Sequence, residues 1–307
     1  MHKTSGRWQY GFILALTTAT LWGMLPIALK GLLSSIDSIT ITWYRFAVAL
    51  VFVAIILTKR NRIPDLKWLK QPPKLRLFAL VIFGLSSNYI LYLMGLDRVS
   101  PSAAQIVIQM APLMLLIGGI FVFKESFSWL QWCGVALFVS GLLLFFNHRM
   151  EALWSGHSDY QWGVILVLVA SVAWAAYALA QKQLLLNYGS QQIMFVSYIA
   201  ASILFFPSAE ILSVSVLSPL QWGLLIFCCA NTLVAYGCFA EALEHWEASR
   251  VSAVLAITPL MTILFAHLVA YFWPDYIQLE ALNSLSIIGA FVLVIGSLIT
   301  AMAKVKA

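Results

Sequence analysis

The chain is dominated by apolar runs of about 20 residues, each long enough to cross the core of a bilayer as an α-helix. Inside lipid, every backbone N–H and C=O must be paired within the protein, so only helices and closed β-barrels can span it. Barrel strands are short and alternate apolar with polar residues, whereas these runs are continuous. Apolar residues make up 62% of the chain and charged residues 10%. These are too few polar residues to cover the surface of a soluble protein. We therefore predict an all-α integral membrane protein.

Ten such runs are present, and we predict one transmembrane helix for each. Phe206-Pro207 interrupts the seventh run, which favours an early end for that helix. The predicted ranges are 9–29, 38–58, 75–95, 101–123, 128–147, 161–181, 191–212, 219–242, 249–273 and 283–303.

Basic residues gather on one side of the predicted helices. With a cytoplasmic N-terminus, fourteen Lys and Arg residues fall in cytoplasmic segments, whereas Lys30, Arg98 and Arg149 fall on the opposite side. Because positive residues are retained in cytoplasmic loops, we predict that both termini are cytoplasmic. The net charge of +6 therefore indicates membrane orientation, and no nucleic-acid partner is predicted.

The sequence contains an internal repeat. The segment "SAAQIVIQMAPLM" at 102–114 aligns with "SRVSAVLAITPLM" at 249–261, and a similar shift places Trp22 on Trp174. Each copy holds five predicted helices, and because five is odd, the second copy enters the membrane from the opposite side. We predict a 5+5 inverted-topology repeat. Its parts are 1–148, an external linker 149–157, and 158–307. Inverted repeats are typical of alternating-access transporters, which bind substrate near the midplane.

Several of these features resemble a known family. They are the Trp of the first helix in each half, Arg45-Phe46 in the second helix, the run "SPSAAQIVIQMAPLM" at 100–114, and the following "FKES" with Glu125. Together they are similar to the drug/metabolite transporter superfamily, specifically its EamA-type exporters, over almost the whole chain. The second half lacks an acidic residue at the position that matches Glu125.

The resemblance implies a multi-pass protein of the bacterial inner (cytoplasmic) membrane that exports small metabolites. It also implies a central cavity lined by the first, third, fourth, sixth, eighth and ninth helices. The sequence supports this placement, because these helices carry most polar and aromatic residues at membrane depth. The partners expected are a small-molecule substrate and the lipid bilayer.

Aromatic and amide side chains form the predicted substrate site. Gln105 and Gln109 are four residues apart and share one helix face, and amides at membrane depth require polar partners. Rings and amides together suit an amphipathic small molecule, although packing between helices is the alternative for each residue. The predicted substrate-binding residues are Trp22, Asn88, Tyr89, Gln105, Gln109, Trp174, Tyr177 and Tyr236. Further polar groups on the same helices are Ser86, Ser87, Tyr92, Asn231 and Thr232.

A second set of residues is predicted to act in gating or structure. Pro112 and Pro259 each leave a carbonyl without its helical donor, which indicates a hinge or a structural kink. Pro26 makes the first helix more bendable than its counterpart in the second half. Arg45, at membrane depth, is predicted as an anchor or gate rather than a direct substrate ligand, with Asp37 as a candidate partner.

His267 is a candidate for proton coupling, because histidine titrates near neutral pH; a structural histidine is the alternative. The fifth and tenth helices are nearly all apolar. They carry glycines seven residues apart, which predicts either close helix packing or a seam for a homodimer. No metal site or cofactor is predicted, because the four cysteines lack ligand spacing and no phosphate-binding loop is present.

The sequence thus predicts a secondary transporter that exports amino acids or related small amphipathic metabolites by alternating access. Without a nucleotide-binding motif on this chain, the energy would come from a substrate or proton gradient. A gradient-coupled importer of a small amine is the alternative. An intramembrane enzyme and a non-transporting receptor are more remote, since the spans show no nucleophile–base pair or clustered metal ligands.

Overall fold

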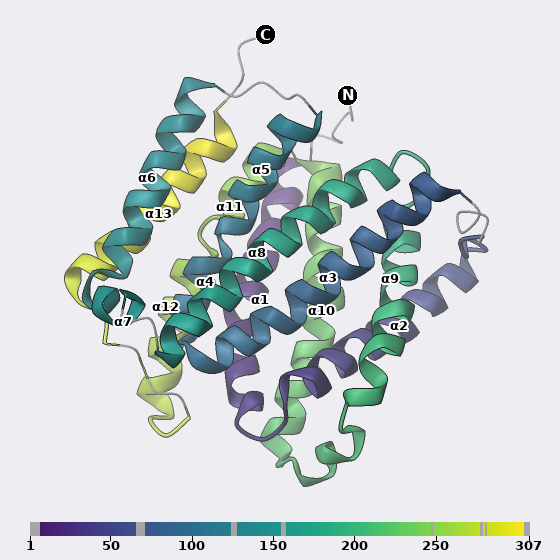
Figure 1. Ribbon diagram of the computed structural model, residues 1–307, viewed down its shortest axis with the longest axis horizontal. Helices are drawn as coiled ribbons and strands as arrows, with labels where there is room; N and C mark the ends of the chain where they lie inside the picture. Colours follow the sequence, from purple (N-terminus) through teal and green to yellow (C-terminus); the bar gives the residue numbers. More distant parts are fainter. Residues whose placement is uncertain are drawn as a thin grey trace.

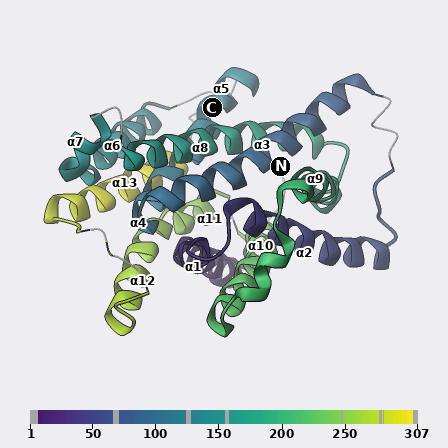
Figure 2. The same ribbon diagram turned by 60° about the horizontal axis from the view of Figure 1, so that its bottom comes forward.

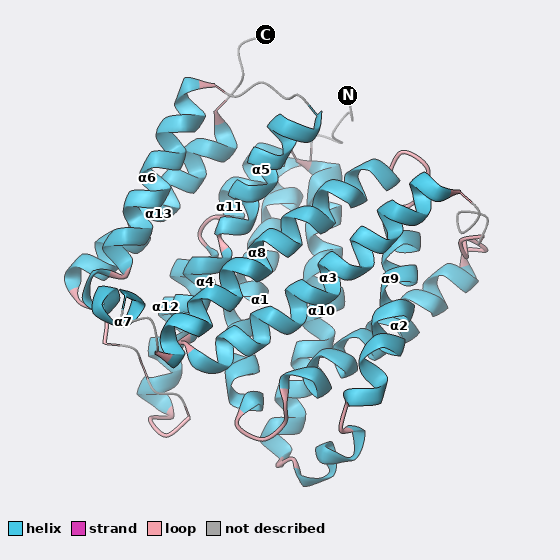
Figure 3. Cartoon of the chain, viewed as in Figure 1, coloured by secondary structure: helices cyan, strands magenta, loops and turns pink. Residues whose placement is uncertain are grey.

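The computed structural model describes residues 7–65, 71–123, 128–154, 158–246, 248–276, 279 and 281–303. Within these residues the secondary structure is entirely helical (Figure 3). Glu125 lies outside them. The α-helices are α1 (Trp8–Leu33), α2 (Ser38–Lys59), α3 (Pro72–Arg98), α4 (Pro101–Ile108), α5 (Met110–Phe123), α6 (Trp129–Phe145), α7 (Met150–Trp154), α8 (Asp159–Leu184), α9 (Ser190–Phe205), α10 (Pro219–His245), α11 (Ala248–Leu255), α12 (Thr258–Phe272) and α13 (Ser284–Met302).

The described residues contain nine helical segments long and apolar enough to cross a membrane. A tenth is reached if α6 is joined to the helical segment Asn147–Leu153, which bends from it by 55°. These segments correspond to the ten predicted runs, so the all-helical membrane fold is confirmed. The helix α1 begins, and α13 ends, at the same end of the molecule (Figure 1). This is the arrangement that an even number of crossings requires.

Two of the predicted helices are broken in the structure. The predicted helix 101–123 is divided into α4 and α5 at Gln109, and the predicted helix 249–273 is divided into α11 and α12 at Ala256 and Ile257. Each break lies within one turn before a proline, which cannot donate to the carbonyl four residues earlier. The two breaks occupy matching positions in the repeat.

Two other boundaries differ from the prediction. The seventh predicted helix, 191–212, ends at Phe205, and a 3₁₀ turn (Phe206–Ser208) and a 3₁₀ helix (Ile211–Val216) follow it. Pro207 explains the early end, because its ring excludes the helical hydrogen bond. The predicted linker 149–157 contains the short helix α7.

The two halves of the chain are interleaved. The most extensive helix–helix contacts in the described residues are α3 with α8, α6 with α13, α1 with α10, and α2 with α9. Each of these pairs joins one helix of the first half to one of the second, and Figure 2 shows α3 beside α8 and α6 beside α13. The pairs α1–α10 and α3–α8 exchange under the repeat, while α2–α9 and α6–α13 map onto themselves. This pattern is that of a pseudo-twofold axis.

The glycines of the predicted fifth and tenth helices face each other within one chain. A Cβ placed on Gly141 of α6 would lie 2.7 Å from the carbonyl oxygen of Gly289 in α13. A Cβ on Gly296 would lie 2.7 Å from the carbonyl oxygen of Gly134. Close packing inside the chain therefore uses these glycines, and a homodimer would need another face. Dimerisation stays a prediction.

Candidate substrate cavity

A cavity of about 620 Å³ lies between helices of both halves. Its wall includes mid-helix residues such as Trp22 on α1 and Asn88 on α3. It reaches helix ends at Gln131 on α6, Lys182 on α8 and Thr300 on α13. Those three ends lie at the end of the molecule where α1 begins (Figure 1). With the predicted orientation, the described part of the cavity extends from the midplane toward the cytoplasm.

Most residues that the sequence predicts for the site line this cavity, although their contact with a substrate stays a prediction. Tyr177, Pro259 and His267 are outside the described lining. The predicted residues that line it are Trp22, Asn88, Tyr89, Gln105, Gln109, Trp174, Tyr236, Pro26, Arg45 and Pro112.

The three residues outside the lining have other surroundings. The phenol of Tyr177 is buried and donates to Met194 Sδ at 3.4 Å, between α8 and α9. Pro259 is buried in the first turn of α12. His267 is exposed on the surface of α12, with its Nδ1 2.8 Å from the carbonyl oxygen of Ile263. Its position separates His267 from the cavity.

Aromatic rings form one wall of the cavity. The ring of Trp22 packs edge-on against Tyr236 of α10, with centroids 5.3 Å apart, and lies 5.8 Å from Phe239. Trp174, the repeat counterpart of Trp22, lines the cavity from α8. Offset and edge-on ring pairs leave flat faces on which an apolar ligand body can pack.

Two asparagines join helices of opposite halves beside the cavity. The Nδ2 of Asn88 in α3 donates to the carbonyl oxygen of Ala170 in α8 at 2.9 Å. The Nδ2 of Asn231 in α10 donates to the carbonyl oxygen of Leu21 in α1 at 2.7 Å. The two bonds lie on the two helix pairs that the repeat exchanges. They hold the cavity walls together across the halves.

The two glutamines of the fourth predicted helix are placed differently. Within the described residues, neither the Gln105 nor the Gln109 side chain forms a hydrogen bond, and both line the cavity. Gln105 is buried, and Gln109 lies at the break between α4 and α5. Unpaired amides in a membrane cavity are suited to bind water or the polar groups of a substrate.

Arg45 is buried in α2 with 4% of its surface exposed, and it lines the cavity. Its Nε donates to Thr232 Oγ1 of α10 at 3.1 Å, and its guanidinium carbon lies 4.6 Å from the ring centroid of Tyr89. The predicted partner Asp37 instead caps α2, because its Oδ1 accepts from the backbone N–H groups of Ile39 and Thr40. No other described residue forms an ion pair with Arg45.

The carbonyls near the prolines receive side-chain donors. Thr258 Oγ1 donates to the carbonyl oxygen of Leu255, which Pro259 deprives of its helical donor, at 2.6 Å. Helix α1 continues through Pro26, and the carbonyl oxygen of Gly23 accepts from Thr262 Oγ1 of α12 at 2.8 Å. A threonine hydroxyl therefore satisfies the carbonyl that Pro259 leaves without its helical donor, and a second one joins α12 to α1.

Hydrogen bonds join helix ends at the end of the molecule where α1 and α3 finish. Lys30 Nζ of α1 donates to the carbonyl oxygens of Leu96 (2.8 Å) and Asp97 (2.6 Å) at the end of α3. A cation at a helix C-terminus also complements the helix dipole. Tyr276 donates to the carbonyl oxygen of Ile27 at 3.4 Å, and burial raises the pKa of its phenol to about 12, so the phenol stays neutral.

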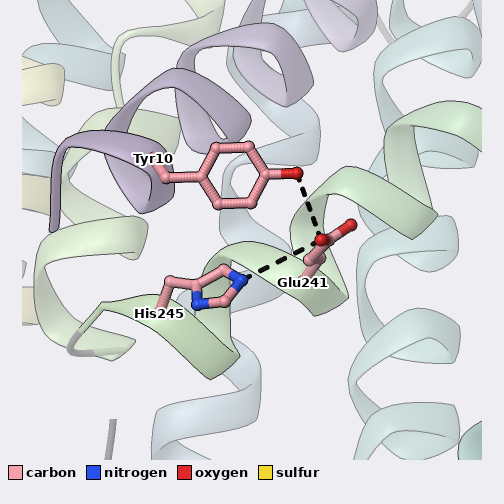
Figure 4. A network of polar contacts seen from close by, with 3 residues as sticks. All are labelled: Tyr10, Glu241 and His245. Atoms are coloured by element: carbon pink, nitrogen blue, oxygen red, sulfur yellow. Dashed lines mark hydrogen bonds and ion pairs between the residues drawn. The ribbon is translucent and has the colours of Figure 1, made fainter. Parts of the chain in front are cut away.

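A polar cluster lies where α1 begins and α10 ends (Figure 4). The Tyr10 hydroxyl donates to Glu241 Oε1 at 3.2 Å, and His245 Nε2 lies 3.9 Å from the same oxygen. The rings of Tyr10 and His245 meet edge-on, with centroids 5.0 Å apart. None of the three lines the described cavity, so the cluster joins α1 to α10 at the predicted cytoplasmic end.

Part of the polar lining did not emerge from the sequence. The sequence predicts a lining from six helices, whereas α2, α6 and α13 also contribute. A lone serine or threonine in an apolar helix gives no signal of which way it faces. The polar lining residues that the sequence did not identify are Gln131, Lys182, Ser252, Thr258, Ser297 and Thr300.

Comparison with known proteins identifies the family. The profile of the EamA-like transporter family matches the chain twice, at residues 9–147 and 161–301. The chain belongs to the EamA-like transporter family. The two matches confirm the predicted resemblance and are consistent with a 5+5 repeat, while the predicted bounds of the halves and of the linker stay a prediction. As an EamA-like protein, it is a transporter rather than an enzyme.

Relatives agree with this assignment. The uncharacterized inner membrane transporter YhbE of Escherichia coli (strain K12) is 40% identical over 292 residues, which cover 95% of this chain and 91% of YhbE. A probable amino-acid metabolite efflux pump of the same organism is 22% identical, over 92% of each chain. A crystal structure shares the fold with a TM-score of 0.64 at 16% identity, over 95% of this chain and 97% of the other. The predicted location, a multi-pass protein of the bacterial inner membrane, is confirmed.

Proposed function

We propose that this EamA-like transporter exports amino acids or related small amphipathic metabolites by alternating access through the central cavity. The observation that carries the proposal is the cavity itself, which combines ring faces with unpaired amides and lies between two inverted halves. Its volume of about 620 Å³ lies in the range of small-molecule sites. The similarity to a probable amino-acid metabolite efflux pump supports the substrate class.

The packing of the two halves limits which helices can move when the cavity opens to one side of the membrane and then to the other. Because the most extensive interfaces join the two halves, separate rigid movement of the halves would break the largest contacts in the molecule. The movement is therefore between sets of helices drawn from both halves. The breaks at Gln109 and at Ala256–Ile257 provide two points of flexion next to the cavity.

Flux into liposomes tests the proposal. Purified protein is reconstituted, and time-dependent movement of labelled amino acids and amines is measured with and without a proton gradient. We expect Trp22→Ala and Gln109→Ala to lower flux about tenfold or more, because each removes a group from the cavity wall. Trp129→Ala is the matched control, since Trp129 is 80% exposed on α6 and outside the described lining.

The outcomes separate the candidate functions. Flux of amino acids that depends on Trp22 and Gln109 supports the proposal, while flux of amines alone supports the alternative importer. Binding without flux would make the protein a receptor. Wild-type flux in both cavity variants would contradict the assigned cavity.

A further inference from the structure

Arg45 is a buried cation of the cavity wall with few hydrogen-bond acceptors among the described residues. Its guanidinium carries five N–H donors, and within the described residues only Nε has a hydrogen-bond acceptor, Thr232 Oγ1. The Tyr89 ring covers one face of the guanidinium and provides no full negative charge. The terminal amino groups of Arg45 thus have no acceptor among the described residues, although the side chain is 96% buried.

The charged residues of the cavity lining also indicate a ligand with a negative charge. The described lining contains no carboxylate, and Arg45 is a buried cation within it. A buried cation at membrane depth is unfavourable without a counter-charge, and a guanidinium fork matches the two oxygens of a carboxylate. A cationic ligand would be repelled from this wall, whereas an anionic group would complete it.

We propose that Arg45 binds the carboxylate of the transported molecule, so that the substrates are small organic acids, zwitterionic amino acids among them, with an apolar or aromatic body. The inference rests on the proposed transport function and names the substrate class of the same cavity. Thr232 acts as a positioning residue, because its hydroxyl holds Nε and directs the remaining donors of the guanidinium. The body of the substrate packs on the rings of Trp22 and Tyr236.

The competing role for Arg45 is a structural anchor between α2 and α10. An anchor uses the Thr232 bond and the Tyr89 ring, and it is indifferent to the charge of a ligand. The two roles therefore differ in ligand selectivity, which can be measured without any substitution.

The test compares matched ligands that differ in one group. Binding to the purified wild-type protein is measured by calorimetry for 3-phenylpropionate, 3-phenylpropionamide, phenethylamine and phenylalanine, and flux of the same compounds is measured in liposomes. We expect both carboxylates to bind at least tenfold more tightly than the amide, and the amine to bind most weakly. Equal binding of acid and amide, or preference for the amine, would overturn the proposal.

Substitutions test which residues produce the preference for acids over amides. Arg45→Gln should abolish the preference for acid over amide, Arg45→Lys should keep part of it, and Thr232→Val should reduce it several-fold. An Arg45→Gln protein that folds and retains the preference contradicts the proposal. If that variant does not fold, the proposal is tested by the ratio of acid affinity to amide affinity in the wild-type protein and in the Thr232→Val variant. Flux that favours amines refutes this inference and leaves transport intact, whereas selective acid binding without any flux refutes the transport function alone.

Discussion

At the residue scale, Lys30 joins two helix ends on the side of the membrane that the sequence predicts to be the outer one. Its ammonium group ties α1 to the last carbonyls of α3, and both bonds must break if these helix ends separate. A hydrogen bond to a charged group contributes about 1.5–3 kcal/mol. Lys30→Met should therefore favour the outward-open form.

Thiol labelling measures this effect. A cysteine at position 256, with the four native cysteines replaced, is exposed to a membrane-impermeant reagent from outside. Lys30→Met should raise the labelling rate about tenfold, because closed-state bonds are lost. Lys59→Met, at the exposed end of α2, is the matched control and should leave the rate unchanged. An unchanged rate in Lys30→Met would show that this contact does not hold the closed state.

Arg45 and His267 show which properties of single residues could not be predicted from the sequence. The sequence identifies both as ionisable residues at membrane depth. It pairs Arg45 with Asp37 by proximity along the chain, but Asp37 caps its own helix and Thr232 of the other half holds Arg45. His267 lies on an exposed face of α12. Which face of an apolar helix meets the cavity depends on tertiary packing, and periodicity cannot show this when every face is apolar.

At the scale of elements, α6 and α13 form a pair that depends on small residues. A Cβ on Gly141 would lie 2.7 Å from both the Gly289 carbonyl oxygen and the Leu293 Cα, and this backbone cannot move aside as a flexible side chain would. The sequence predicts close packing or a dimer seam for these glycines, and the contact partner within the chain is visible only in the fold. Close backbone approach is the usual role of small residues in membrane helices.

Gly141→Ala should destabilise the folded protein by about 1–3 kcal/mol, because the added methyl group overpacks this interface. Gly237→Ala in α10 is the matched control. A Cβ there meets no atom within 4 Å beyond its chain neighbours and the nearby backbone of its own helix, so the change should be neutral or stabilise by up to about 1 kcal/mol. Thermal unfolding of the two variants in detergent measures the difference. Equal midpoints for both would contradict the close packing of α6 and α13.

At the scale of the whole molecule, the fold could be predicted because a bilayer permits few alternatives. The length of the apolar runs predicted the transmembrane helices, and the repeat with five helices per copy predicted the inverted arrangement. The interleaving of the halves could not be predicted, since helices with uniformly apolar surfaces carry little information on their neighbours. Much of the central cavity lining was predictable from rings and amides at membrane depth, such as Trp22 and Gln109. The end of the lining on the predicted cytoplasmic side, with Ser297 and Thr300 from α13, could not be predicted.

We propose that the cavity is a substrate site that opens alternately to the two sides of the membrane. The most direct measurement is labelling of a single cysteine at position 256, where Ala256 lines the cavity, by an impermeant thiol reagent in right-side-out and in inside-out vesicles. We predict labelling from both sides, with transported carboxylates slowing each reaction. Labelling from one side only, or rates that no transported compound changes, would contradict it.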